Sequence, residues 1–100
     1  MVIIYCEMHI APEKQAEYIA RVNEAGIVEA TNREPGCVSY ELAASASTPG
    51  KLYIVERWES SAALPAHMKG ANYAALMKIN AEYGLKGDAA VYTAEPLKMQ

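Results

Sequence analysis

The fold of this chain is decided by residues 37–59, CVSYELAASASTPGKLYIVERWE, which predict two strands joined by a hairpin loop. In the first seven residues, Val38, Tyr40 and Leu42 alternate with polar side chains, and a period of two is typical of a strand. The small, breaker-rich segment ASASTPG follows and predicts the loop. The segment KLYIVERWE then predicts a second strand, which starts apolar and ends charged.

Helical patterns lie on both sides of this hairpin. Before it, apolar residues recur at helical spacing, so we expect one helix from Glu13 to Arg33. After it, residues 60–83 form a second helical zone. Pro65 and Gly70 make an uninterrupted helix unfavourable there, so this zone predicts a short helix, a break and a longer helix that ends near residue 83.

One strand at each end of the chain completes the pattern. Residues 2–10, VIIYCEMHI, and residues 88–97, DAAVYTAEPL, both have the character of strands. The resulting order β-α-β-β-α-β predicts a single α+β domain with a ferredoxin-like fold over residues 1–100. Its antiparallel four-stranded sheet has the strand order 4-1-3-2, with the helices on one face.

The predicted strand order also decides the state of the two cysteines. The third strand would separate Cys6 on the first strand from Cys37 on the second. Two strand spacings are about 9.5 Å, whereas the Cα atoms of a disulfide lie within about 7 Å. We therefore expect two free thiols, with Cys37 as a packing residue.

Apolar side chains occur on both faces of the predicted sheet. On the first strand, Ile4 and Met8 point to one face, while Ile3 and Tyr5 point to the other. Helices can cover only one face, and 52% of all residues are apolar, which is generous for a lone small domain. A second copy of the chain could cover the other face, so we expect a homodimer.

Charge and composition argue against several classes of partner. The net charge is −3 and the cationic side chains are scattered singly, so neither nucleic acid nor an anionic membrane is an expected partner. No apolar run reaches the ~18 residues of a membrane span. The first ten residues lack the basic region and the cleavage site of a signal peptide, so we expect a cytoplasmic protein.

Several motifs together point to a known family. Residues 33–42 read REPGCVSYEL, residues 56–60 read ERWES, and residues 63–64 and 66–68 read AL and AHM. With these motifs the chain resembles the antibiotic biosynthesis monooxygenase family over nearly its whole length. The resemblance implies a dimeric α+β barrel with a pocket between the sheet and the helices of each subunit. It also implies a cofactor-independent monooxygenase that oxidises a small hydroquinone-like or anthrone-like aromatic with O₂ to a quinone.

Cofactor and metal motifs are absent from the sequence. The glycines form neither a dinucleotide-binding pattern nor a phosphate loop, and no His or Cys pair has the spacing of metal ligands. The haem-degrading relatives carry an Asn, a Trp and a haem-ligating His at positions where this chain has Glu7, His67 and Met77. We therefore expect no cofactor and no metal.

His67 and Glu7 are the candidate catalytic residues. An imidazole has an ordinary pKa near ~6.5 and can accept a phenol proton at neutral pH. Glu7 has apolar neighbours in the sequence, and burial would raise its pKa and suit it to act as a base or proton shuttle. The alternatives are a structural histidine and an ion pair of Glu7 with Arg57 or a lysine.

Aromatic and thioether side chains are the candidate substrate-binding residues. Tyr40 and Trp58 lie on strands expected to be neighbours, and Tyr73 and Met77 share a helix face. These four could line a pocket or simply fill the core. The charged strand end around Glu56 is interpreted as a structural set of ion pairs.

Two other functions stay open on the same fold. One is an isomerase or lyase that acts on a small polar or phosphorylated metabolite, and Arg or Lys side chains in the pocket would favour it. The other is a ligand-binding dimer without catalytic activity, which would bind its ligand without consuming oxygen.

Overall fold

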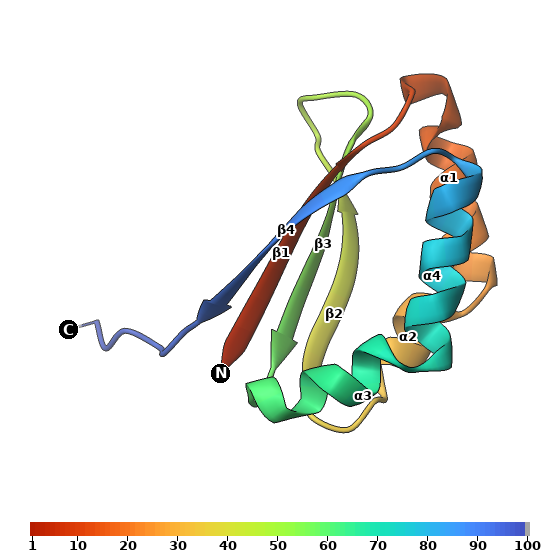
Figure 1. The fold of residues 1–100 in the computed structure, drawn as a ribbon. Helices are drawn as coiled ribbons and strands as arrows, with labels where there is room; N and C mark the ends of the chain where they lie inside the picture. Colours follow the sequence, from red (N-terminus) through yellow and green to blue (C-terminus); the bar gives the residue numbers. More distant parts are fainter. Residues whose placement is uncertain (100) are drawn as a thin grey trace.

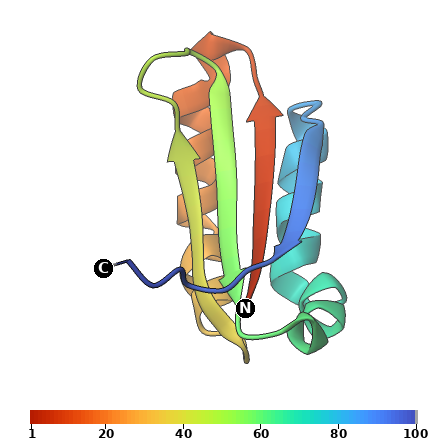
Figure 2. The ribbon, with the colours of Figure 1, turned by 90° about the vertical axis from the view of Figure 1, so that its left-hand side faces the viewer.

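The sheet of the computed structural model, which describes residues 1–99, has four antiparallel strands in the order β2-β3-β1-β4. The strands are β1 (Val2–His9), β2 (Cys37–Ala44), β3 (Lys51–Trp58) and β4 (Gly87–Thr93). Figure 2 shows this order face-on, and Figure 1 shows that all helices lie on one side of the sheet. The predicted α+β, ferredoxin-like fold and its strand order are therefore confirmed.

The helical segments differ from the prediction in one place. They are η1 (Pro12–Lys14), α1 (Gln15–Glu24), α2 (Ile27–Asn32), η2 (Ser61–Ala63), α3 (Leu64–Met68) and α4 (Ala71–Glu82). The single helix predicted from Glu13 to Arg33 is wrong because the chain breaks at Gly26, whose φ of 71° lies in the left-handed region. The predicted break at Gly70 is confirmed. Pro65 lies in the first turn of α3, where a missing N–H group is harmless.

The core lies between the sheet and the helices. β3 is the central strand, and its alternate residues Leu52, Ile54, Glu56 and Trp58 are all buried on the helix side. Tyr18 of α1, which is 0% exposed, is among the largest side chains that pack on this layer. The alternation therefore places one charged residue, Glu56, in a row of apolar side chains that faces the helices.

A β-bulge interrupts the start of β2. Cys37 pairs with Trp58 and Ser39 pairs with Arg57, so Val38 is an extra residue in β2. The predicted alternation is therefore wrong for Val38, whose side chain is 42% exposed instead of facing the helices.

The strand pairing separates the two cysteines, as predicted. Cys6 pairs with Ile54 of β3, and Ile54 pairs in turn with Leu42 of β2. β3 thus lies between the strands that carry Cys6 and Cys37, and both residues are free thiols.

The face of the sheet opposite the helices is open. Tyr5 and Tyr92 on this face are 40% and 56% exposed. β4 is shorter than the predicted 88–97, because Thr93 already pairs with Val2 at the start of β1. Beyond it, residues 94–99 lead away from the helices (Figure 1). No helix within residues 1–99 is long and apolar enough to cross a membrane.

Candidate active site

A cavity of about 410 Å³ lies between the sheet and helices α3 and α4. Its wall is mostly apolar, with Met8 and Ile54 from the sheet and Leu76 and Met77 from α4. A cavity of this size suits a small-molecule ligand. Within residues 1–99, neither Arg nor Lys lines the cavity, and no three His, Cys, Asp or Glu side chains are arranged to hold a metal ion.

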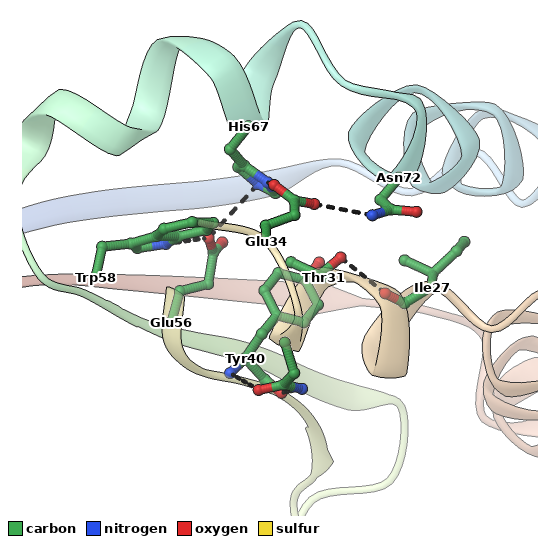
Figure 3. A network of polar contacts seen from close by, with 9 residues as sticks. Ile27, Thr31, Glu34, Tyr40, Glu56, Trp58, His67 and Asn72 are labelled. Atoms are coloured by element: carbon green, nitrogen blue, oxygen red, sulfur yellow. Dashed lines mark hydrogen bonds and ion pairs between the residues drawn. The ribbon is translucent and has the colours of Figure 1, made fainter. Parts of the chain in front are cut away.

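His67 forms part of the cavity wall and is only 6% exposed. The short helix α3 presents its side chain inward, where Nδ1 lies 2.8 Å from Oε1 of Glu34. Figure 3 shows these two side chains facing each other. Because a carboxylate only accepts hydrogen bonds, Nδ1 is the donor in this contact.

Glu34 is held from its other side as well. It lies in the turn between α2 and β2, and Oε2 accepts a hydrogen bond of 2.9 Å from Nδ2 of Asn72 at the start of α4. Both carboxylate oxygens are therefore engaged. This pair of contacts fixes the orientation of the His67 ring.

Glu56 is a second carboxylate at the same end of the cavity. Its Oε1 accepts a hydrogen bond of 2.9 Å from the indole N–H of Trp58 and lies 3.7 Å from Nε2 of His67. Burial raises the pKa of Glu56, while the Trp58 hydrogen bond and His67 oppose that rise and the charge of Glu34 adds to it. A carboxylate with a raised pKa is a stronger base than an ordinary one.

Aromatic rings surround the imidazole of His67. The ring centroids of Trp58, Tyr73 and Tyr40 lie 4.7, 5.6 and 6.2 Å from its centroid. Tyr40, Tyr73 and Met77 line the cavity, and their role in binding a substrate stays a prediction. Trp58 is 0% exposed and does not line the cavity, so its predicted place in the pocket wall is wrong. It packs behind His67 instead.

Glu7 lies on the open face of the sheet, away from the cavity. Its side chain is 36% exposed, and its carboxylate lies 3.0 Å from Nε2 of His9 and 3.5 Å from Nζ of Lys51. The hydrogen bond with His9, together with Lys51, holds the pKa of Glu7 below its ordinary value. The expectation of a buried base is therefore wrong, because the even-numbered residues of β1 face the helices. The alternative of an ion pair with a lysine is confirmed.

The sequence prediction missed two residues of this site, Glu34 and Glu56. Glu56 was interpreted as part of a strand-end set of ion pairs, although it shares the alternation of Leu52 and Ile54, and that signal placed it on the buried face. Glu34 directly follows the helix predicted to end at Arg33 and is not among the candidate residues. Its sequence position carries no signal, since its contact with His67 joins residues far apart in the chain.

Asn80 adds a polar group further along α4. It lines the cavity, and its Oδ1 accepts a hydrogen bond from the hydroxyl of Tyr18. Its NH₂ group is therefore the part that remains to donate to a ligand. From Tyr73 to Asn80 the helix advances by about 10 Å, at ~1.5 Å per residue. The cavity thus has its acidic end near His67 and a hydrogen-bond donor near the other end of α4.

Comparison with known proteins agrees with this fold. The family model described as antibiotic biosynthesis monooxygenase matches residues 1–79. A crystal structure from Deinococcus radiodurans, provisionally assigned to that activity, has a TM-score of 0.87 at 22% identity and covers 100% of this chain and 99% of that chain. A similarly assigned structure from Nitrosomonas europaea has a TM-score of 0.82 at 18% identity, with 94% and 98% covered.

A crystal structure described as an antibiotic biosynthesis monooxygenase is more similar in sequence. It has 28% identity and a TM-score of 0.79, with 96% of this chain and 100% of that chain covered. No curated protein matches this chain at a significant level.

Proposed function

This chain belongs to the antibiotic biosynthesis monooxygenase family, and we propose that it oxidises a small hydroxylated aromatic compound with O₂ to a quinone. The observation that carries this proposal is the placement of Glu56 and His67 at one end of a mostly apolar cavity. A hydroquinone-like or anthrone-like compound suits such a cavity, and its hydroxyl proton would find an acceptor there.

Loss of the hydroxyl proton activates such a substrate toward O₂. Glu56, with His67 beside it, accepts the proton, and the aromatic anion gives one electron to O₂. The resulting superoxide and aryloxyl radical combine at a ring carbon to form a C–O bond. A proton from Glu56 is then transferred to this peroxide. The O–O bond breaks as the C–H proton leaves, and this proton combines with the departing hydroxide, which yields C=O and water. One O₂ is consumed, one H₂O is released, and the substrate supplies all the electrons.

The rest of the cavity supports this chemistry by offering an apolar wall to the aromatic ring and by holding the anion. Tyr40 and Tyr73 provide aromatic walls close to His67, and Met77 extends the apolar lining. The NH₂ group of Asn80 can donate to a second oxygen of the substrate. A hydrogen-bond donor placed where negative charge develops stabilises the transition state most effectively in a dry site.

The rival functions make different demands on the cavity. An isomerase of a phosphorylated metabolite needs Arg or Lys side chains around the phosphate, and the cavity lining within residues 1–99 contains neither. This observation favours the aromatic substrate. A ligand-binding protein without activity would use the same apolar cavity, so oxygen consumption is the measurement that separates it from an oxygenase.

We also propose that a second copy of the chain covers the open face of the sheet. Tyr5 packs against Tyr53 on this face with 5.4 Å between ring centroids, yet it remains 40% exposed. Residues 94–99 extend on the same side of the molecule (Figure 1), and Leu97 among them is 81% exposed. A homodimer with its sheets face to face would bury these apolar groups.

Oxygen uptake by the metal-stripped protein tests the enzymatic proposal. A panel of hydroquinones and anthrones is used, and autoxidation without protein is the baseline. Glu56→Gln should lower the uptake above baseline by at least about tenfold, equal to about 1.4 kcal/mol of barrier. Glu7→Gln is the matched control, because it makes the same chemical change on the open face, and should leave uptake unchanged. Equal losses in both variants, or no uptake by the wild type, would overturn the proposal.

A further inference from the structure

His67 separates two hollows. Besides the cavity, an outer groove of about 580 Å³ is lined by the 34–36 turn, the segment that follows β3 and the junction of α3 and α4. Among residues 1–99, His67 alone lines both the cavity and this outer groove. Several groove residues, including Pro35 and Glu59, are exposed, so the outer groove is in contact with solvent.

The two carboxylates beside His67 do not line the same space. Glu56 lines the cavity but not the outer groove, and Glu34 lines the outer groove but not the cavity. Nε2 of His67 lies 3.7 Å from Glu56, while Nδ1 lies 2.8 Å from Glu34. The three groups therefore form a row, with Glu56 on the side of the cavity and Glu34 on the side of the outer groove. Figure 3 shows the two carboxylates beside the ring of His67.

We propose that Glu56, His67 and Glu34 form a proton relay that connects the cavity with the outer groove. This inference rests on the proposed function, since it assigns a path to the proton of the bound hydroxyl. Glu34 is the positioning residue at the outer end of the relay. It acts through His67 and does not touch the substrate.

Each transfer in the relay breaks one bond to hydrogen and forms another. The hydroxyl O–H of the bound compound breaks and Glu56 gains the proton. Glu56 then protonates Nε2, the N–H bond at Nδ1 breaks, and Glu34 takes that proton and passes it to water in the outer groove. Reversal of the same steps returns a proton to the cavity. The 3.7 Å gap between Glu56 and His67 must shorten to about 3 Å for transfer, so this step gates the relay.

The titratable groups around His67 are carboxyl and phenol groups. The titratable side chains that face it are Glu34 from the turn, Glu56 from β3, Tyr40 from β2 and Tyr73 from α4. Within the described chain, no Arg or Lys lines either hollow. A purely structural Glu34 would need only to accept the hydrogen bond from Nδ1, whereas a relay needs it to accept a proton.

Two variants separate these roles. Glu34→Gln keeps an oxygen that accepts from Nδ1 but removes the proton acceptor, and it also sets its NH₂ group against the NH₂ donor of Asn72. Adding Asn72→Asp restores a hydrogen bond at that contact, since the amide introduced at position 34 can then donate to the new carboxylate. The double variant should therefore recover the thermal stability of the wild type without recovering direct proton transfer from His67.

The readout is the ionisation of bound 4-nitrophenol after a rapid pH jump under nitrogen, followed by its absorbance. Glu34→Gln and the double variant should both ionise the probe at least about tenfold more slowly than the wild type, a barrier increase of about 1.4 kcal/mol. Glu59→Gln, which removes a carboxylate from the outer groove without touching His67, should ionise it at about the wild-type rate.

Recovery of the wild-type rate in the double variant would overturn the relay and leave Glu34 a structural role, and so would a wild type that does not ionise the probe. The assay contains no oxygen, so the two proposals can fail separately. Slow ionisation in both Glu34 variants, combined with no oxygen uptake by the wild type, would keep the relay and reject the monooxygenase.

Discussion

Replacing Trp58 with Phe removes one hydrogen-bond donor from a buried carboxylate and keeps most of the ring packing. The indole N–H donates to Oε1 of Glu56 at 2.9 Å, and Trp58 is 0% exposed. A hydrogen bond to a charged group stabilises by about 1.5–3 kcal/mol, and one to a neutral group by about 1 kcal/mol. The smaller ring leaves a void of roughly 40 Å³, which costs about 1 kcal/mol at ~24 cal/mol per Å³.

The effect of Trp58→Phe therefore depends on the charge of Glu56. Because burial raises the pKa of this carboxyl above its value in the unfolded chain, the folded state holds the proton more tightly. The free energy of unfolding therefore falls as the pH rises from the pKa of Glu56 in the unfolded chain to its raised pKa in the folded protein. It falls more steeply in the variant, because the variant lacks the indole donor that favours the charged carboxylate. Above this window we expect Trp58→Phe to lower the free energy of unfolding by about 2.5–4 kcal/mol, and below it by about 2 kcal/mol.

Urea unfolding followed by circular dichroism measures the loss in the free energy of unfolding at a pH above the window and at a pH below it. One fixed protein concentration is used, so that association contributes equally to the wild type and the variant. In a Glu56→Gln background the side chain at this position cannot ionise, so the loss caused by Trp58→Phe should be the same at both pH values. A loss that is independent of pH while Glu56 is present would refute the reasoning, because it would mean that the indole does not sense the carboxylate charge.

Two further predictions concern the open face and the cavity thiol. Tyr92→Lys places a charge in the proposed dimer interface, so the mass in sedimentation equilibrium should fall from dimer to monomer, whereas Ala20→Lys on the helix side should not change it. A monomeric wild type would contradict the dimer. Burial, followed by the charges of Glu56 and Asp88, raises the pKa of Cys6 and keeps it as the thiol. In a Cys37→Ser background, iodoacetamide should therefore react with Cys6 near pH ~8.5 more slowly in the folded protein than in urea, and equal rates would contradict this.

The order of elements was predictable because it follows from hydrophobic periodicity. Strands of period two and helical zones of period 3.6 are visible in the sequence, and the β-α-β-β-α-β order then leads to the observed sheet. The break at Gly26 and the bulge at Val38 could not be predicted in this way. Glycine also occurs inside helices, and a bulge leaves the local composition unchanged.

The site was predictable only in part. His67 was a candidate because an imidazole can accept a phenol proton at neutral pH, and the structure does place it at the cavity. Glu7 failed as a candidate because apolar neighbours in a strand do not reveal which face the helices will cover. Glu56 carried a usable signal in the alternation of β3, whereas the contact of Glu34 with His67 arises only when the 34–36 turn folds against α3.

The bulge in β2 also affects how the chain tolerates changes in length. Because Cys37 pairs with Trp58 and Ser39 with Arg57, removing Val38 would leave a regular strand with every other pair in register. Tyr40 would still lie opposite Glu56, and the cavity wall would keep its composition. A one-residue deletion, which elsewhere in a strand turns the following side chains to the other face, would here change only the local bend. The Val38 position is thus a place where this strand can lose one residue without disturbing the face that lines the cavity.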